Sequence, residues 1–510
     1  MLGEIARPRV RRLLSNTLHA ASGRLAAVFV WLLLTPTVLH ALGPERFGLW
    51  SIFFALTGYF GGFDLGLAQG TLRHVAAARV HGLRDVAAAH TVLAFGGYLL
   101  LGLVWLALMI AACGPLLDFL RVPAPLHPDA TRVLIGSALA FVLSGWLNVL
   151  VAALQGHGRF DLANRVLLTC SLSQGLGVWL ALGRHAGIGV LIGVLMAGWL
   201  LGVLVALAML PLAAPGGGWV APWRAWSQVR AALRFGLPMQ AASLSSVIHQ
   251  HLDKFLLSRF VGLATVAPYE IGFRVSSAAV TFPQQFLLAA MPAAAELQAE
   301  GRAETLRTLF VRGDRYVMAG TAVWLAALVG GAAPLLVAWL GPGQGDAILA
   351  TRGLAVAWAV ALVTGMGVSL ARGIGRTGLE ARFALVVLAV HAGLSLWWVP
   401  RYGLRGALLA TICGNLVGAL VFLWSLAGAL GWNRPGTMFG GRAMPVIAAM
   451  AGVAAAAGSA RWLVPGRGVR GWAAALATAA AGGAIAALVL FVTQRPGEEK
   501  RGVPDAGGRA

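Results

Sequence analysis

Apolar runs long enough to cross a bilayer follow one another along almost the whole chain. A transmembrane helix needs about 20 consecutive residues with few or no charges. Only 11% of the 510 residues are charged and 59% are hydrophobic, with a mean hydropathy of +0.79. Soluble domains carry about a quarter charged residues. The sequence therefore predicts an all-α polytopic membrane protein.

Hydropathy separates about 14 transmembrane helices, each with ends good to a few residues. They are expected near residues 15–38, 47–70, 88–112, 130–153, 164–182, 188–210, 233–260, 266–291, 315–340, 347–370, 381–399, 403–428, 443–463 and 471–493.

The net charge of +21 is distributed unevenly between the two sets of loops. If an even number of helices leaves both termini on one side, that side carries about 25 Lys and Arg and the other about ten, which is the pattern of the positive-inside rule. We therefore predict a multi-pass protein with both termini in the cytoplasm. The two lysines against 37 arginines indicate a GC-rich bacterial genome, so the expected location is the bacterial inner (cytoplasmic) membrane. Basic loops facing anionic lipids account for the charge, and no nucleic acid partner is expected.

One short polar segment occurs twice. The stretch "QGHGRFDLANR" (155–165) returns 217 residues later as "RGIGRTGLEAR" (372–382), with five of eleven positions identical. Both copies fall in predicted short cytoplasmic loops, where glycine permits a tight turn. Their G-x-G is not a dinucleotide fingerprint, because that motif requires a preceding strand and a βαβ unit.

Two further pairs of segments repeat at nearly the same distance. Residues 186–205 match 402–421 at an offset of 216, and residues 42–50 match 261–269 at an offset of 219. Three matches in the same order favour an internal duplication. Because six helices is an even number, the halves would be parallel repeats, and transporters of this kind bind substrate where the halves meet.

The predicted organisation is two six-helix lobes followed by an extra helix pair. The expected segments are a basic cytoplasmic N-terminus (1–14), a first lobe (15–212), a cytoplasmic linker (213–232), a second lobe (233–430), the extra pair (431–493) and a cytoplasmic tail (494–510).

The sequence offers no signal for a cofactor, a metal or an ATPase domain. The three cysteines, Cys113, Cys170 and Cys413, lie far apart in apolar runs, which matches no metal-binding spacing. The P-loop pattern G-x-x-x-x-G-K-[ST] does not occur. Any transport is therefore expected to use an ion gradient, the membrane potential or the gradient of the substrate itself.

Three blocks carry a resemblance to a known family: "LGPERFGLWSIFFALTGYFGGFDLGLAQGTLRHVA" (42–76), "HLDKFLLSRFVGLATVAPYEIGFRV" (251–275) and "MPAAAEL" (291–297). They resemble the polysaccharide transporter family, which includes the O-antigen flippases, within the multidrug/oligosaccharidyl-lipid/polysaccharide exporter superfamily. The resemblance covers about residues 15–430.

This resemblance implies a flippase and not an enzyme. Members carry an oligosaccharide on a polyprenyl pyrophosphate from the cytoplasmic to the periplasmic leaflet by alternating access, for polysaccharide or O-antigen biosynthesis. The implied partners are the lipid-linked oligosaccharide, membrane lipids, and the polymerase and glycosyltransferases of the same pathway.

The first predicted span carries a polar stripe. Arg24 lies in mid-span, and His19 lies about one turn before it. Charges inside spans are costly and usually face a cavity, and a guanidinium suits bidentate contact with phosphate. Arg24 is thus a candidate for binding the pyrophosphate, and His19 for coupling or charge balance. The alternative is a structural ion pair, or an Arg24 side chain that reaches the cytoplasmic face.

A second group of charges interrupts the seventh and eighth spans. Asp253 and Lys254 are adjacent, so they point about 100° apart on a helix. Either one of them lines the cavity, with Asp253 coupling protons or balancing Arg24, or they form an interhelical salt bridge. Glu270 and Arg274 have the i, i+4 spacing of a local ion pair, and Arg274 and Lys254 are further candidates for the pyrophosphate.

Asp64, close to Gly61, Gly62 and Gly66, is assigned a helix-end and packing role. Two other functions stay open at this stage: a multidrug or other lipid exporter of the same superfamily, and a membrane-embedded glycosyltransferase or polymerase. The enzyme would need a sizeable outward loop, and the longest one here, near 114–129, is short and rich in proline.

Overall fold

The structure, a computed structural model, is entirely helical in the residues it describes. These are residues 2–62, 66–80, 82, 84–213, 244–288, 290–433, 443–462 and 469–493, and the side chains of residues 2–29 also lie outside the description.

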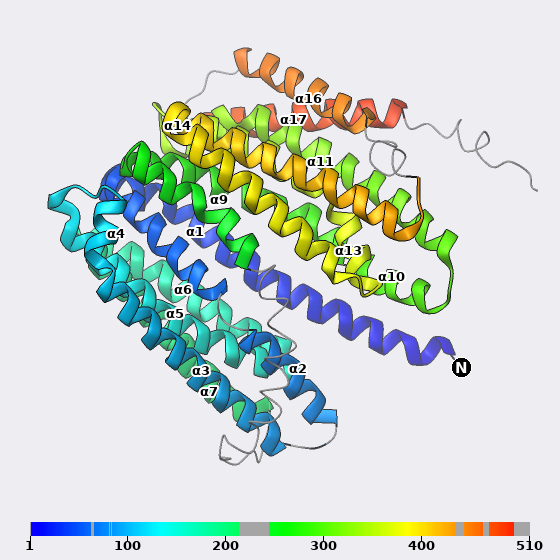
Figure 1. Cartoon of the computed structure of the whole chain (residues 1–510), viewed down its shortest axis with the longest axis horizontal. Coiled ribbons are helices and arrows are strands. Elements are labelled where there is room, and N and C mark those ends of the chain that lie inside the picture. Colours follow the sequence, from blue (N-terminus) through cyan, green and yellow to red (C-terminus); the bar gives the residue numbers. More distant parts are fainter. Residues whose placement is uncertain are drawn as a thin grey trace, which may run out of the picture. The chain divides into compact units, whose positions relative to one another are not determined.

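Fifteen α-helices with assigned bounds and a helix over 244–260 make up most of the described chain. Figure 1 labels most of these helices. The α-helices are α1 (Leu2–Gly62), α2 (Leu67–Val80), α3 (Arg84–Ala111), α4 (Cys113–Phe119), α5 (His127–Gly156), α6 (Phe160–Gly183), α7 (Ile188–Ala213), α9 (Val266–Leu288), α10 (Ala290–Ala299), α11 (Ala303–Leu340), α12 (Gly345–Leu362), α13 (Gly365–Gly373), α14 (Thr377–Leu430), α16 (Ala443–Trp462) and α17 (Val469–Thr493). Two short 3-10 helices are η1 (Ala124–Leu126) and η3 (Leu263–Thr265).

Eight helical segments of the described chain are long and apolar enough to cross a membrane. This confirms the predicted all-helical, multi-pass membrane protein. The count of fourteen stays a prediction, because several predicted spans fall within one long helix. Helix α14, for example, has 54 residues and contains both spans predicted at 381–399 and 403–428.

Glycines interrupt the long helices where the sequence predicts loops. Helix α1 is broken at Gly43, with φ 74° and ψ 169°, and α14 at Gly403, with φ 55° and ψ −131°. Gly262, at the start of η3, has φ 129°. Only glycine adopts such angles without strain, so these residues let two helices follow each other with almost no loop.

Several boundaries differ from the sequence prediction. The span expected at 347–370 is divided between α12 and α13, and α11 begins before the span expected at 315–340. The helix expected at 47–70 is divided between α1, described as far as Gly62, and α2, which begins at Leu67. Gly66 lies between them with φ 69°, a conformation that terminates a helix. Helix α2 is more polar than the long helices of this chain because it carries Arg73, His74 and Arg79.

The chain forms two compact units. The first comprises Met1–Ile271 and His391–Ala407, and the second comprises Gly272–Val390 and Leu408–Ala510. The chain passes between the units inside α9 and inside α14. The two six-helix lobes inferred from the sequence repeats stay a prediction.

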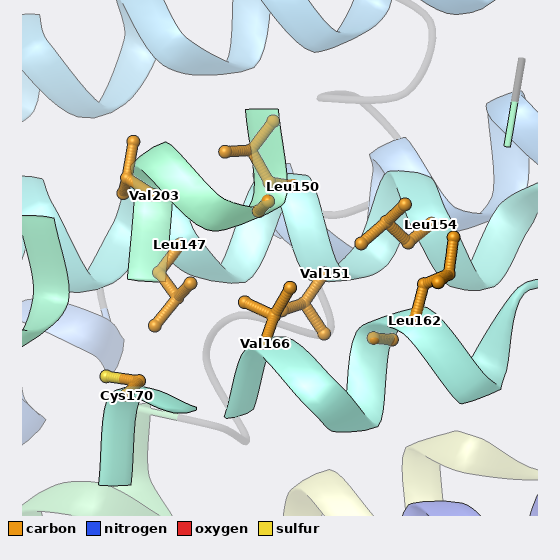
Figure 2. Close-up of a cluster of buried hydrophobic side chains, with 10 residues drawn as sticks. Leu147, Leu150, Val151, Leu154, Leu162, Val166, Cys170 and Val203 are labelled. Atoms are coloured by element: carbon orange, nitrogen blue, oxygen red, sulfur yellow. The ribbon is translucent and has the colours of Figure 1, made fainter. Parts of the chain in front are cut away.

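In the first unit, α5 packs against α1, α2, α3 and α7, and α6 packs against α1 and α7. A cluster of buried apolar side chains joins α5, α6 and α7; it includes Leu147, Leu154, Val166, Cys170 and Val203. Figure 2 shows these side chains lying between the three helices. Cys170 is a free, buried cysteine that acts here as a small apolar side chain.

In the second unit, the C-terminal pair α16 and α17 packs on α11 through small residues. A Cβ atom on Gly330 would lie 2.0 Å from the Cβ of Ala456, and one on Gly452 would lie 2.5 Å from the carbonyl oxygen of Gly482. Glycine and alanine at such positions let helices approach closely, as is common within membranes.

The two copies of the repeated segment have the same backbone. Gly158 has φ 77° and Gly375 has φ 76°. In both copies the amide of the next arginine closes the helix end: Arg159 N–H donates to the carbonyl of Leu154 at 2.9 Å, and Arg376 N–H donates to that of Ala371 at 2.8 Å. The repeated sequence therefore produces a repeated helix-to-helix turn.

The side chains of these arginines also make equivalent contacts. Arg159 donates from Nη1 to the carbonyl oxygen of Leu212, at 3.3 Å. Arg376 donates from Nη1 to the carbonyl oxygen of Ala429, at 2.6 Å. Leu212 and Ala429 are themselves 217 residues apart, the offset of the repeat. The duplication inferred from sequence is thus visible in side-chain contacts.

Candidate functional site

Asp253 lies at the centre of a buried polar cluster in the first unit. It belongs to the helix of residues 244–260, and its side chain has no exposed area. Burying a carboxylate is costly unless it is paired and hydrogen-bonded. The cluster therefore has to supply donors from other helices.

Three side chains surround this carboxylate. The Tyr269 hydroxyl, on α9, donates to Oδ2 of Asp253 at 3.0 Å. The Ser395 hydroxyl, on α14, donates to Oδ1 at 3.0 Å. His391, also on α14, places Nε2 3.1 Å from the same Oδ1. Because an ionised carboxylate only accepts hydrogen bonds, the hydrogen of that contact lies on Nε2.

A second histidine continues the chain of contacts. His249, one turn before Asp253 on the same helix, places its Nδ1 3.0 Å from Nδ1 of His391. The two rings are nearly perpendicular, at 81°, with centroids 4.5 Å apart. His391 is completely buried, whereas His249 is half-buried. The row His249–His391–Asp253 thus leads from a partly accessible group to a fully buried one.

Lys254 and Glu270 form a separate ion pair beside this row. Nζ of Lys254 lies 2.6 Å from Oε2 of Glu270, and the two side chains are 1% and 4% exposed. The pair joins the 244–260 helix to α9. Asp253 and Lys254 thus point to different partners, as expected for neighbouring residues on a helix.

Aromatic and histidine side chains cover the helix on its α1 side. The ring of Tyr59, on α1, meets the ring of His251 edge-on at 5.8 Å and that of Phe255 at 5.3 Å. A Cβ on Gly58 would lie 3.0 Å from Nε2 of His251. Glycine at this position therefore allows α1 to approach the histidine.

The structure describes only part of the predicted site. Arg24 and His19 belong to α1, but their side chains lie outside the described residues, and so does Asp64. Arg274 lies on α9 and is half-buried. The predicted roles of Arg24, Arg274 and Lys254 in substrate binding, and of Asp253 and His19 in coupling, stay predictions.

Sequence reasoning missed three members of the cluster, which are His391, Ser395 and Tyr269. His391 and Ser395 have i, i+4 spacing in the eleventh predicted span, which places both on one face of a helix. That spacing was the available signal. Tyr269 offered none, because a tyrosine near a span end reads as an interfacial anchor.

The cluster is suited to holding protons. It combines one carboxylate and two imidazoles in direct contact, and histidine changes charge near neutral pH. Among the described residues no group of three metal-ligating side chains is arranged to hold a metal ion.

A model of the family described as polysaccharide biosynthesis protein matches residues 41–341, which is more than half of the 510-residue chain. This agrees with the resemblance carried by residues 42–76, 251–275 and 291–297. A search of curated proteins finds no significant match.

Several solved structures have the same fold. A multidrug-resistance MATE family transporter of the MOP superfamily, inward-facing, has a TM-score of 0.67 at 18% identity and covers 79% of this chain and 94% of its own. A lipid II flippase in an inward closed conformation has a TM-score of 0.66 at 12% identity and covers 94% and 98%. A MOP superfamily transporter from Pyrococcus furiosus has a TM-score of 0.60 at 16% identity and covers 82% and 95%. These likenesses identify the MOP-type fold.

Proposed function

The chain belongs to the polysaccharide biosynthesis protein family, and from that membership we propose that it is a transporter of a polysaccharide precursor. Its cargo is an oligosaccharide linked to polyprenyl pyrophosphate. It carries this lipid across the bacterial inner membrane by alternating access, with both termini in the cytoplasm. The product serves polysaccharide or O-antigen assembly.

The extent of the likeness to the lipid II flippase carries this proposal. Its alignment includes 94% of the chain. Residues 1–442, which precede the C-terminal pair, make up a smaller share of the 510 residues, so the alignment must also include residues after 442. The shared fold therefore reaches into the C-terminal pair α16–α17. That flippase is named for a lipid-linked cargo, so its fold, extra helices included, supports a lipid-linked cargo here.

The cargo has a pyrophosphate head, a polar glycan and a long apolar tail. Arginine binds phosphate with a planar, bidentate geometry, so Arg24 and Arg274 are our candidates for the head. The ammonium of Lys254 faces Glu270 at 2.6 Å. Lys254 would take part only if that pair opens during the transport cycle.

A multidrug exporter is the second candidate, because a MATE family transporter has a TM-score of 0.67 against this chain. Its alignment covers 79% of the chain, a share that does not require the C-terminal pair. The solved structures described above are transporters and a flippase, so they lend no support to a membrane-embedded glycosyltransferase or polymerase.

The test is a flipping assay in sealed proteoliposomes. A fluorescent nitrobenzoxadiazole-labelled oligosaccharide on a polyprenyl pyrophosphate is incorporated, and dithionite quenches the label in the outer leaflet only. We expect the protein to make the whole pool quenchable, and Arg24→Ala to slow this far more than Arg24→Lys, which keeps the charge.

Arg312→Ala, a change in the N-terminal half of α11, is the matched control for loss of an arginine. If the protein does not increase the fraction of labelled lipid that dithionite quenches but does export ethidium, the multidrug exporter is favoured instead.

A further inference from the structure

We propose that His249, His391 and Asp253 form a proton relay that couples transport to a proton gradient. The inference rests on the proposed transport function, because a relay drives nothing unless a cargo moves. All three residues, with Ser395 and Tyr269, lie in the first unit. Proton binding by the cluster itself can be measured without any cargo.

The contact between the two histidines requires a hydrogen between two nitrogens. Nδ1 of His249 and Nδ1 of His391 are 3.0 Å apart, a distance that two bare lone pairs would not hold. Since Nε2 of His391 donates to Asp253, a neutral His391 has an unprotonated Nδ1. His249 then carries its hydrogen on Nδ1 and donates it inward.

This arrangement allows one proton to enter as another arrives at the carboxylate. A proton adds to Nε2 of the half-buried His249, and the Nδ1 hydrogen of His249 moves to Nδ1 of His391. The Nε2 hydrogen of His391 then moves to Oδ1 of Asp253. Each transfer breaks one N–H bond and forms one N–H or O–H bond, and the net change is one proton gained. Every hydrogen bond in the row is kept, with its direction reversed.

The first copy of the repeat shows that the fold does not need these groups. Asp253 lies nine residues before Gly262, and the residue nine before Gly43 is Leu34. His391 lies sixteen residues after Gly375, and its counterpart in the first copy is Gln174.

The first-copy side chains pack without a buried charge. Leu34 and Val30, the counterpart of His249, meet Gly175 on α6: a Cβ there would lie 2.5 Å from Val30 Cγ1 and 3.6 Å from Leu34 Cδ1. Gln174 donates instead to the carbonyl of Leu195, at 3.0 Å. The first copy thus builds the same helix pairing from apolar contacts and one amide hydrogen bond, so a buried acid and histidines are not required to form it.

Other polar and titratable groups lie around the relay. Ser395 and Tyr269 donate hydroxyl hydrogens to Asp253. Lys254 and Glu270 offset each other's charge at 2.6 Å. His251 and Tyr59, from α1, meet beside the row. These contacts place Tyr269, Lys254, Glu270, His251 and Tyr59 beside the relay. The proton that moves within the relay is shared by the carboxylate and the two imidazoles.

The hydrogen bonds favour a proton over a metal cation such as sodium. Sodium is a hard ion bound through oxygen lone pairs, as calcium and magnesium are. Here both hydroxyls and the imidazole present hydrogens to the carboxylate. To bind sodium, the cluster would have to turn these donors away.

Infrared spectroscopy of the purified protein tests the relay directly. We expect a carboxylic C=O stretching band that appears as pH is lowered, is absent in Asp253→Asn, shifts its midpoint in His391→Gln, and does not respond to sodium at fixed pH. Asp314→Asn is the matched control, because Asp314 is a buried acid of the second unit. An unchanged band in Asp253→Asn, or a band abolished by sodium, would overturn the proposal.

The coupling is tested in the proteoliposome assay. With one proton per cycle, a gradient of one pH unit should shift the distribution of the fluorescent lipid between leaflets about tenfold, and His391→Gln should lose this shift. Flipping that ignores the gradient in the wild type would overturn the relay as a coupling device. Absence of flipping with an intact infrared response would instead refute the proposed cargo and leave the proton site standing.

Discussion

The cytoplasmic turns of the two repeats are alike, whereas the helix interiors differ. Gly158 and Gly375 adopt the same left-handed backbone, with φ 77° and 76°. In the interior, Leu34 of the first copy corresponds to Asp253 of the second. A duplicated fold has thus kept its turns and has acquired or lost a buried acid in one copy.

The turns show which contacts the fold itself requires. The charge partners differ: Arg159 pairs with Asp161 at 2.9 Å in the first copy, and Arg372 pairs with Glu380 in the second. Both copies nevertheless keep an arginine on a carbonyl near the end of a distant helix. Carbonyls in a helix's last turn have no partner within the helix. The arginine donates a hydrogen bond to such a carbonyl, which the charge pairs do not do.

The interiors show the opposite. In the first copy, Leu34 and Val30 close the helix pair through apolar packing. In the second, Asp253 and His249 stand at these two positions and belong to a hydrogen-bonded network with His391. Breaking such a network is expensive, because a buried partner is left unsatisfied. The predictions below use each copy as the reference for the other.

The largest effect is expected at the interior acid. Asp253→Leu, which introduces the first-copy residue, leaves the hydrogens of Tyr269, Ser395 and His391 without their acceptor. We expect a loss of about 3–5 kcal/mol in the free energy of unfolding, measured as detergent-solubilised thermal or denaturant unfolding.

The triple variant Asp253→Leu, His391→Gln, Ser395→Val copies the first repeat at three positions. It should recover more than half of that loss, while transport stays absent. A triple variant as unstable as Asp253→Leu would mean that the two interiors are not interchangeable and that the comparison fails.

The next largest effect is expected where both copies have a glycine facing a helix. A Cβ on Gly373 would lie 2.5 Å from the carbonyl oxygen of Met291 and 2.8 Å from Ala294 Cβ, while one on Gly156 would lie 2.8 Å from Val75 Cβ. Overpacking costs about 1–3 kcal/mol. Both alanine variants should be destabilised, Gly373→Ala more, because its closest obstacle is backbone. The thermal midpoints of the two variants decide this, and a reversed order would contradict it.

The arginines of the turns should matter about equally. Arg159→Ala and Arg376→Ala each remove a contact to a carbonyl, that of Leu212 or Ala429. We expect small decreases in the thermal midpoint, similar in the two variants, since both side chains are partly exposed. Glu380→Ala serves as the control and should change less, because exposed ion pairs contribute little. A decrease confined to one arginine would show that only one turn depends on it.

The smallest effect is a pH dependence present in the first turn alone. Burial, with the positive charge of Arg79, lowers the pKa of His157 below its usual 6.5. As pH falls below 6.5, His157 binds a proton more readily in the unfolded chain than in the folded chain. Its contribution to the free energy of unfolding is therefore complete above pH 6.5 and is lost as pH falls toward the lowered pKa.

Ile374 occupies the same place in the second turn, so His157→Ile is the matched variant. Its thermal midpoint should fall less than that of the wild type between pH 7.5 and pH 5.5. Equal decreases in the two proteins would assign the acid sensitivity to another group.

The predicted helices agree with the structure because hydropathy is a local property. The spans expected at 130–153 and 188–210 lie within α5 and α7, and α16 covers 443–462 of the span expected at 443–463. The interruption at Gly66 was missed because a cluster of glycines can end a helix or pack inside it. Nothing in the local sequence separates those two outcomes.

The candidate site was found only in part, because its members come from distant segments. Asp253 stood out as a charge in an apolar run. His391 is 138 residues away from Asp253. The residues next to His391 in the sequence do not distinguish it from a histidine that is hydrogen-bonded within its own helix.

The sequence alone determined that this chain is a helical membrane protein, that its turns need glycine, and that one segment occurs twice. These properties follow from hydrophobic length and from backbone sterics, which act over a few residues. The partners of the buried charges were decided by the tertiary structure. Whether Asp253 meets His391, or Lys254 meets Glu270, depends on which helix faces come together, and that is settled by packing across the whole unit.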